Sequence, residues 1–313
     1  MTTFESDNCD LMELTRSQLL SEEISPTQQC VILCLAVVIA TFVTSTLTGN
    51  YSQVDKIWSI TPFLFAWIVV CDARTLLMAI LATIWGVRLT WNFNRRGGYK
   101  WPPWDGDEDY RWKYIQDGMY VKILAKPAIW VIFNFCFISL YQNVLLLLIA
   151  TPSIIAHLAA TKCGEASLNK YDYLAAISFL TFVVIESIAD NQQYSFQTEK
   201  YRLMDAGKPL EGDYAYGFNQ SGLFAIVRKP NYAAEQSIWF CFYLFSIGAV
   251  QGQQYFNWSI SGPVLLCLLF QGSGRFTEKI TLTKYPKYKD YQKRVPLYTP
   301  NPFQRSSLKD KLK

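Results

Sequence analysis

Residues 127–150, PAIWVIFNFCFISLYQNVLLLLIA, form the stretch that decides the fold. None of these 24 residues is charged. A helix needs about 20 mainly apolar residues to cross the roughly 30 Å hydrocarbon core of a membrane. The stretch is therefore predicted to be a transmembrane helix. Similar apolar runs occur at six other places in the chain: 31–48, 57–71, 75–92, 171–189, 236–256 and 258–272.

The composition indicates a membrane protein. The chain has 313 residues, of which 51% are hydrophobic and only 17% are charged, against roughly 25% charged in an average globular protein. A soluble helical protein of this composition would have too little polar surface. The net charge of +4 is small and scattered, which argues against nucleic acid as a partner. We predict an all-α, polytopic membrane bundle of about seven transmembrane helices.

Charge divides the chain into three regions. A polar segment covers residues 1–30, the bundle covers 31–272, and a basic region covers 273–313. Loops 93–126 and 190–235 are rich in Lys and Arg, and such loops stay in the cytosol. With seven spans and the N-terminus outside, both loops and the C-terminus are predicted to be cytosolic.

Two short segments carry further expectations. The last five residues, KDKLK, match a dilysine retrieval signal, which predicts a multi-pass protein of the endoplasmic reticulum. Residues 11–20 are either a short interfacial helix or disordered.

Metal and disulfide chemistry are not expected. The eight cysteines include no CxxC pair and several lie in apolar runs, so we interpret them as small buried hydrophobic residues. His157 is the only histidine. The acidic run 105–109 lacks His or Cys partners and is predicted to belong to an interfacial loop anchored by tryptophans. No metal site is predicted.

Ionisable residues at membrane depth are costly and are therefore functional candidates. Those near the predicted span ends could form a polar pocket, or they could pair with one another to orient helices. No GxGxxG motif follows a predicted strand and no GxxxxGK[ST] motif occurs, so a nucleotide would have to be held by the bundle and its basic loops. Arginines suit phosphate because guanidinium binds it through paired hydrogen bonds. The candidates are polar or ionisable residues near span ends and arginines suited to phosphate: Asp55, Arg88, Arg95, Arg96, Glu186, Asp190, Arg202, Arg228, Asn231 and Glu235.

Several motifs together resemble the steroid 5-alpha-reductase superfamily, in particular a largely uncharacterised membrane branch. The strongest is YGFNQSGLF at 216–224, followed by VRKPNY at 227–232, Glu235 and Trp239. Three further motifs occur in the order that the family has them. They are VDKIW at 54–58, Arg88 followed by RRGG at 95–98, and TEK at 277–279 followed by tyrosines. The resemblance covers roughly residues 50–300.

The resemblance implies an NADPH-dependent oxidoreductase that reduces a carbon–carbon double bond of a steroid-like or other lipid enone. Asp55 falls where the reductases place the acidic residue that engages the substrate carbonyl, so it is the predicted catalytic residue. The alternative is a structural role for Asp55, as a helix cap or as a charge at the membrane interface. The residues predicted to bind NADPH are Arg88, Arg96, Asp190, Tyr216, Arg228, Asn231 and Glu235.

The sequence departs from the steroid enzymes at two places. Val54-Asp55 stands where they carry a Gln-Glu pair, and residues 271–275 lack the histidines of their last span. Two alternatives therefore remain. One is an S-adenosylmethionine-dependent membrane methyltransferase of the isoprenylcysteine type, which has a related helical core. The other is a non-catalytic membrane protein that binds lipid or acts as a scaffold.

Overall fold

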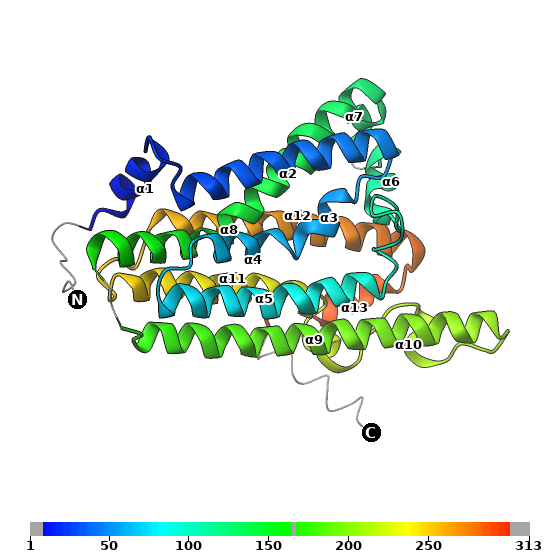
Figure 1. Ribbon diagram of the computed structural model, residues 1–313. Coiled ribbons are helices and arrows are strands. Elements are labelled where there is room, and N and C mark those ends of the chain that lie inside the picture. Colours follow the sequence, from blue (N-terminus) through cyan, green and yellow to red (C-terminus); the bar gives the residue numbers. More distant parts are fainter. Residues whose placement is uncertain (1–8, 120, 165–166, 301–313) are drawn as a thin grey trace. The chain divides into compact units, whose positions relative to one another are not determined.

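The computed structural model describes residues 9–119, 121–164 and 167–300 (Figure 1). These residues form helices and connecting loops, with no β-strand among them, so the predicted all-α class is confirmed. The chain divides into two compact units. The first contains residues 1–179 and 239–266, and the second contains 180–238 and 267–313.

Within the described part of the chain, four helices are long and apolar enough to cross a membrane. A helix of 23 residues, such as the first of them, measures about 34 Å at 1.5 Å per residue, which matches the hydrocarbon thickness. The apolar side chains Ile32, Leu35 and Ile39 lie exposed along it, as expected for a surface in contact with lipid tails. The four are α2 (Pro26–Thr48), α5 (Ala73–Asn94), the continuous helix Pro127–Cys163 and α9 (Lys170–Asp205).

The predicted span 57–71 is not one helix. The structure has α3 (Gln53–Trp58) and α4 (Thr61–Ile68) instead. Pro62 lies in the first turn of α4, and it has no N–H to donate to the Trp58 carbonyl one turn earlier, so the helix breaks before it. Hydropathy alone could not detect this break, and the count of seven spans remains a prediction.

Other predicted boundaries also shift. The helix predicted to end at residue 150 continues to Cys163 through α7 (Pro127–Phe133), a π-helical stretch (Asn134–Tyr141), α8 (Gln142–Leu158) and a π-helical end (Ala159–Cys163). The first part of the predicted loop 190–235 belongs to α9. The last two predicted spans correspond to α11 (Pro230–Ala249) and α12 (Ser261–Lys284). Helices can continue past their apolar stretch because the polar turns then lie outside the hydrocarbon.

The first unit is built around α4, which packs against α5 and α8 (Figure 1). Phe65, Val69, Ile154 and Leu158 form its core together with Cys30 and Cys34 from α2. Gly86 allows α5 to approach the α3–α4 turn, since a Cβ at this position would lie 2.4 Å from the Ser59 carbonyl oxygen. Any larger residue would force these helices apart.

The N-terminal segment is partly helical. Asp10 caps α1 (Leu11–Leu19) by accepting hydrogen bonds from the Met12 and Glu13 amides, so the helical alternative for residues 11–20 is correct. Ser25 and Gln28 form a capping box at the start of α2. The chain is thus folded well before its first membrane-length helix.

A disulfide joins Cys9 to Cys163 across 154 positions of sequence. The expectation that every cysteine is a buried hydrophobic residue is therefore wrong for this pair. It holds for Cys30, Cys34 and Cys241, which are free and buried, and it is also wrong for Cys71 and Cys136, which are exposed. The pairing could not be predicted because it depends on the end of the long helix meeting the N-terminal segment, and cysteine spacing does not encode that contact.

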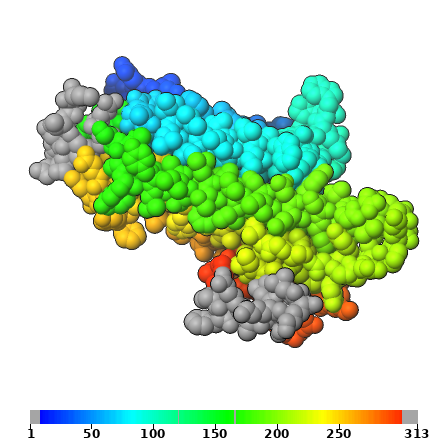
Figure 2. All heavy atoms as spheres, turned by 90° about the horizontal axis from the view of Figure 1, so that it is seen from below, coloured from blue at the N-terminus to red at the C-terminus, as the bar shows by residue number. Residues whose placement is uncertain are grey.

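The second unit surrounds the later part of α9. It includes α10 (Gly212–Tyr216), a 3-10 turn (Gly222–Ala225) and α13 (Tyr288–Arg294). Figure 2 shows the segment after α9, in yellow-green, lying against that helix. The contact includes a stacked ring pair between Phe196 and Tyr214 at 5.1 Å and a hydrogen bond from the Leu223 amide to Gln192 Oε1. Phe218, Tyr288 and Tyr291 form an aromatic core.

Candidate active site

Asp55 lies on α3, which is fastened to the loop that follows α5. The ammonium group of the neighbouring Lys56 is buried and donates hydrogen bonds to Gln53 Oε1 at 3.2 Å, to the Pro103 carbonyl at 3.2 Å and to the Asp105 carbonyl at 2.5 Å. Gln53 also donates to the Trp104 carbonyl at 2.8 Å. These bonds hold the loop against α3, beside Asp55.

The Asp55 carboxyl lies in a poorly hydrated environment. Its Oδ2 is buried and makes no hydrogen bond to any described residue. The pKa of Asp55 is raised to about 6; burial is the largest cause and the nearby Asp109 adds to it, while Arg111 and hydrogen bonds from Ser52 and Trp112 act in the opposite direction. Burial of a carboxyl favours its neutral form in this way. A substantial fraction of Asp55 is therefore protonated in mildly acidic solution.

Asp109 and Arg111 form a separate ion pair at the start of α6 (Tyr110–Gln116). Arg111 donates to Asp109 through Nε at 2.9 Å and Nη2 at 2.7 Å, and its amide donates to Oδ1 at 2.8 Å. Burial would raise the pKa of Asp109, but Arg111 lowers it below its ordinary value. The positive charge of Arg111 is thus largely balanced by Asp109, which limits how far it can stabilise an ionised Asp55.

The acidic run 105–109 serves to order its own loop. Asp105 accepts from the Gly106 amide at 2.8 Å, Asp107 pairs with Lys100 at 2.6 Å, and Glu108 accepts from the Tyr51 amide at 2.6 Å. Among the described residues, no three His, Cys, Asp or Glu side chains gather as metal ligands.

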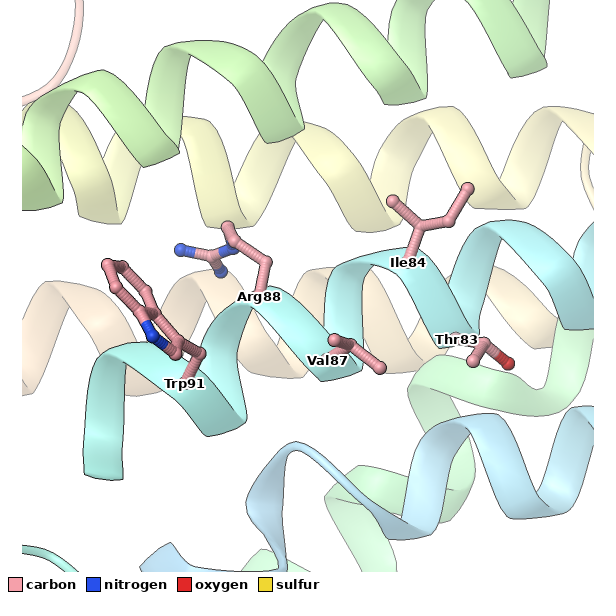
Figure 3. Close-up of a pocket in the computed structure, with 5 residues that line it drawn as sticks. All are labelled: Thr83, Ile84, Val87, Arg88 and Trp91. Carbon is pink, nitrogen blue, oxygen red and sulfur yellow. The ribbon is translucent and has the colours of Figure 1, made fainter. Parts of the chain in front are cut away.

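Arg88 lines a shallow hollow on the surface of α5. Thr83, Ile84, Val87 and Trp91 surround it. Figure 3 shows Arg88 and Ile84, one helical turn apart, extending to the same side of α5. Arg96 follows the end of this helix and is exposed. Both arginines belong to the first unit, as does Asp55.

The second unit contains the other predicted cofactor residues. Asp190 on α9 and Glu235 on α11 are each only 4% exposed. Asn231, in the first turn of α11, donates from Nδ2 to Asp190 Oδ1 at 3.4 Å. Tyr216, at the end of α10, is 41% exposed and has the Lys287 ammonium 5.2 Å from its ring centre. The structure thus joins the buried Asp190 to the half-buried Asn231 by a hydrogen bond.

Arg228 makes a buried ion pair within the second unit. Its Nε and Nη2 donate to the Glu278 carboxylate at 2.6 and 3.0 Å, and its Nη1 donates to the Gln292 and Val295 carbonyls. Burial opposes the ionised form of Glu278, but Arg228, Tyr288 and Gln292 lower its pKa below the ordinary value. Arg228 therefore ties α12 to α13 in this structure, and its role as a phosphate ligand remains a prediction.

Trp112 is the residue near Asp55 that the sequence did not single out. It lies on α6, 6% exposed, in a cluster with Val54, Trp130 and Ile138. Its segment, YRWKYIQ, is short and polar and shows no apolar run. No pattern around residue 112 indicates that this tryptophan is buried near a carboxyl group.

The helical architecture and these buried polar groups define a helical membrane protein. The chain matches the family described as "Protein of unknown function (DUF1295)" over residues 41–295, and it belongs to that family. It is 37% identical over 270 residues to the "Uncharacterized protein C594.04c" of Schizosaccharomyces pombe, a match that covers 82% of this chain and 74% of that protein. No solved structure matches the chain.

Proposed function

We propose that this protein is an NADPH-dependent membrane reductase that saturates the carbon–carbon double bond of a lipid enone, related to the steroid 5-alpha-reductases. The proposal combines the motifs at 54–58, 216–224 and 227–235 with the buried polar residues found at those positions. The observation that carries it is Asp55. Its buried Oδ2 has no hydrogen-bond partner among the described residues, and its pKa is raised to about 6.

The residues of the second unit fit part of the proposed cofactor. The carboxylates of Asp190 and Glu235 can accept hydrogen bonds from ribose hydroxyls and a carboxamide, and the Asn231 amide can both donate and accept. The burial of Asp190 and Glu235 would strengthen such bonds. The resemblance assigns the phosphates to Arg88 and Arg96, and Arg228 is paired with Glu278. NADPH, when bound, would supply a hydride to the β carbon of the enone.

Asp55 would act on the oxygen of the enone. As the new C–H bond forms at the β carbon, the double-bond electrons move toward the carbonyl and its oxygen becomes negative. A protonated carboxyl can donate a hydrogen bond to that oxygen in a site that excludes water. The enolate oxygen would take the Asp55 proton to give an enol. The enol would then return that proton to the Asp55 carboxylate as the α carbon takes up one proton from solvent, so that one hydride and one proton together complete the two-electron reduction.

A cofactor-binding measurement tests the proposal. Detergent-purified protein is titrated with NADPH, with S-adenosylmethionine in parallel, and with a Glu235→Ala variant. Saturable NADPH binding that Glu235→Ala weakens at least tenfold supports the reductase. Glu199→Ala is the matched control, since Glu199 is an exposed carboxylate on α9 paired with Arg202, and it should bind like the wild type.

The other outcomes have definite meanings. Binding of S-adenosylmethionine alone would favour the methyltransferase alternative, and binding of neither compound by folded protein would favour a lipid-binding or scaffold role.

We also propose that the Cys9–Cys163 end of the first unit faces an oxidising compartment. Disulfides persist in the lumen of the endoplasmic reticulum or outside the cell and are rare in the cytosol. This agrees with the orientation expected from the basic loops, in which the N-terminus lies outside the cytosol. The proposed dilysine signal falls at 309–313, outside the described residues.

A further inference from the structure

The long helix Pro127–Cys163 carries two buried polar groups whose hydrogen bonding is incomplete. They are the Ser139 hydroxyl and the Asn143 side-chain oxygen Oδ1, and neither has a partner among the residues that the structure describes. Ser139 is fully buried and Asn143 is 2% exposed. A buried polar group without a partner destabilises the protein, and the hydrocarbon of a membrane offers none. We therefore expect a bound molecule to bond to these two groups.

The Asn143 amide has only one possible orientation. Its Nδ2 donates to the Ser139 backbone carbonyl at 2.7 Å and to Thr41 Oγ1 of α2 at 3.1 Å. A backbone carbonyl can only accept, so the amide must direct its nitrogen toward it and its oxygen elsewhere. Exchanging the two ends of the amide would place two oxygens together. The atom that lacks a partner is thus an acceptor, and it lies about one helical turn from the Ser139 hydroxyl.

The unused Ser139 hydroxyl lies in a local change of helix type. Ser139 belongs to the π-helical stretch Asn134–Tyr141. A buried serine within a helix commonly donates to a carbonyl of the preceding turn. Ser153, in the α-helical part of the same long helix, donates to the Ala150 carbonyl at 2.7 Å, whereas Ser139 makes no such bond. A π-helix closes each turn over one more residue than an α-helix, and such turns often occur at functional sites.

The chemistry of the two groups restricts what can bind to them. Asn143 Oδ1 can only accept, so the bound molecule must donate, and the Ser139 hydroxyl can donate or accept. Side chains buried this deeply admit only a small molecule. The neighbouring Leu140 and Val144 pack against an apolar cluster, and such surroundings would not solvate a cation. Water is small and uncharged, and buried waters bond to polar groups of this kind in proteins.

We propose that one water molecule binds at the π-helical turn, where it donates a hydrogen bond to Asn143 Oδ1 and accepts one from the Ser139 hydroxyl. The water replaces the backbone bond that Ser139 lacks, so the π-helical turn is stable at a depth where lipid tails cannot hydrogen-bond. It also orients the Asn143 amide that bonds to Thr41 and thereby joins α2 to the long helix. The site contains none of the residues proposed for the reductase, so neither proposal depends on the other.

Asn134 provides an internal control for this site. It lies on the same long helix and is 1% exposed. Its Oδ1 accepts from the Ser45 hydroxyl at 3.2 Å, and its Nδ2 donates to Ser45 Oγ at 3.0 Å and Thr46 Oγ1 at 3.2 Å. Both ends of this amide therefore have protein partners. A water bound as proposed would contact Asn143 and not Asn134.

The test uses the full-length protein with ¹⁵N-labelled asparagine in bilayers of deuterated lipid. Solid-state NMR measures the magnetisation transferred from water protons to the side-chain nitrogen of each asparagine. We expect transfer to Asn143 and none above background to Asn134. Equal transfer to both would indicate general penetration of water and would overturn the site. Transfer to neither would mean that the two groups satisfy each other directly, and it would overturn the site as well. This comparison requires no variant to fold.

Two serine variants test the second partner of the water. Ser139→Ala removes the hydroxyl and should weaken binding of the water about fivefold, the effect of one hydrogen bond, which lowers the transfer to Asn143. Ser153→Ala is the matched control, because Ser153 is equally buried and its hydroxyl is bonded to the Ala150 carbonyl. It should leave the transfer unchanged. A transfer that is the same in Ser139→Ala as in the wild type would refute a site built from both groups.

Discussion

Replacing Asp172 by Asn removes the main counter-ion of the buried Arg74 guanidinium and leaves only Asp72, 3.9 Å from Arg74 Nη1, as a nearby carboxylate. In the first unit, Arg74 Nε donates to Asp172 Oδ1 at 2.8 Å and Nη2 donates to Oδ2 at 2.9 Å. The two side chains are 1% and 0% exposed. Asp172 also accepts the Asn169 amide at 2.8 Å. An Asn at this position can keep one acceptor, but its amide nitrogen opposes a guanidinium N–H and the positive charge is no longer balanced.

Removing one partner of a buried, doubly hydrogen-bonded ion pair costs about 3–5 kcal/mol of unfolding free energy. We expect that loss for Asp172→Asn and a similar loss for Arg74→Met. The double variant Arg74→Met/Asp172→Asn should lose much less than the sum of the two, because the buried guanidinium is removed together with its main partner. The cost of each single change comes mainly from the partner that is left behind.

The assay is unfolding in mixed detergent micelles, followed by circular dichroism, for the wild type, both single variants and the double variant. The exposed pair Lys100–Asp107 serves as the control, and Asp107→Asn should change stability little. If the losses of the two single variants add in the double variant to within about 0.5 kcal/mol, the two residues are energetically independent and the reasoning fails.

Three further predictions follow from other contacts. Non-reducing peptide mapping by mass spectrometry should recover one peptide pair that joins Cys9 to Cys163, and recovery of both cysteines as free thiols would contradict the fold of the N-terminal segment. Turnover per unit of bound substrate should be maximal below about pH 6 and fall about tenfold per pH unit above it, because Asp55 must be protonated and its pKa is raised to about 6; a rate that is flat from pH 5 to 8 would exclude Asp55 as the donor. Glu278→Gln should destabilise the second unit by about 3 kcal/mol and expose the α12–α13 region to trypsin. The pKa of Glu278 is lowered in the folded protein. Its stabilising effect is therefore full above the ordinary glutamate pKa and is lost as pH falls through the lowered value. In acid, the stability of the wild-type protein should approach that of the variant.

The sequence predicted the class of fold because that class depends on local composition. The uncharged run 127–150 can be stable in a membrane only as a helix, since every backbone polar group must be bonded within its own segment. The same reasoning identified the apolar parts of α2, α5 and α9. It failed at the 57–71 run, where Pro62 breaks the helix, and at the helix ends, because polar turns beyond the membrane show no apolar pattern.

Most of the candidate residues could also be predicted from the sequence, either because they are charged at membrane depth or because they match motifs of the steroid 5-alpha-reductase superfamily. It placed Asp190 and Asn231 in the same predicted region, and the structure joins them by a hydrogen bond. For Arg228, the pairing with Glu278 was not predictable, because fifty residues separate the partners and many arrangements of the chain would keep them apart.

Only the tertiary structure decided the environment of Asp55 and the pairing of Cys9. The raised pKa of Asp55 comes from α6 and the 101–109 loop folding over α3, and the disulfide comes from the far end of a long helix meeting the N-terminal segment. Desolvation and disulfide formation both depend on which distant groups come within a few ångströms. A sequence specifies those contacts only through the complete fold, whereas the apolar content of a helix is fixed by the residues within it.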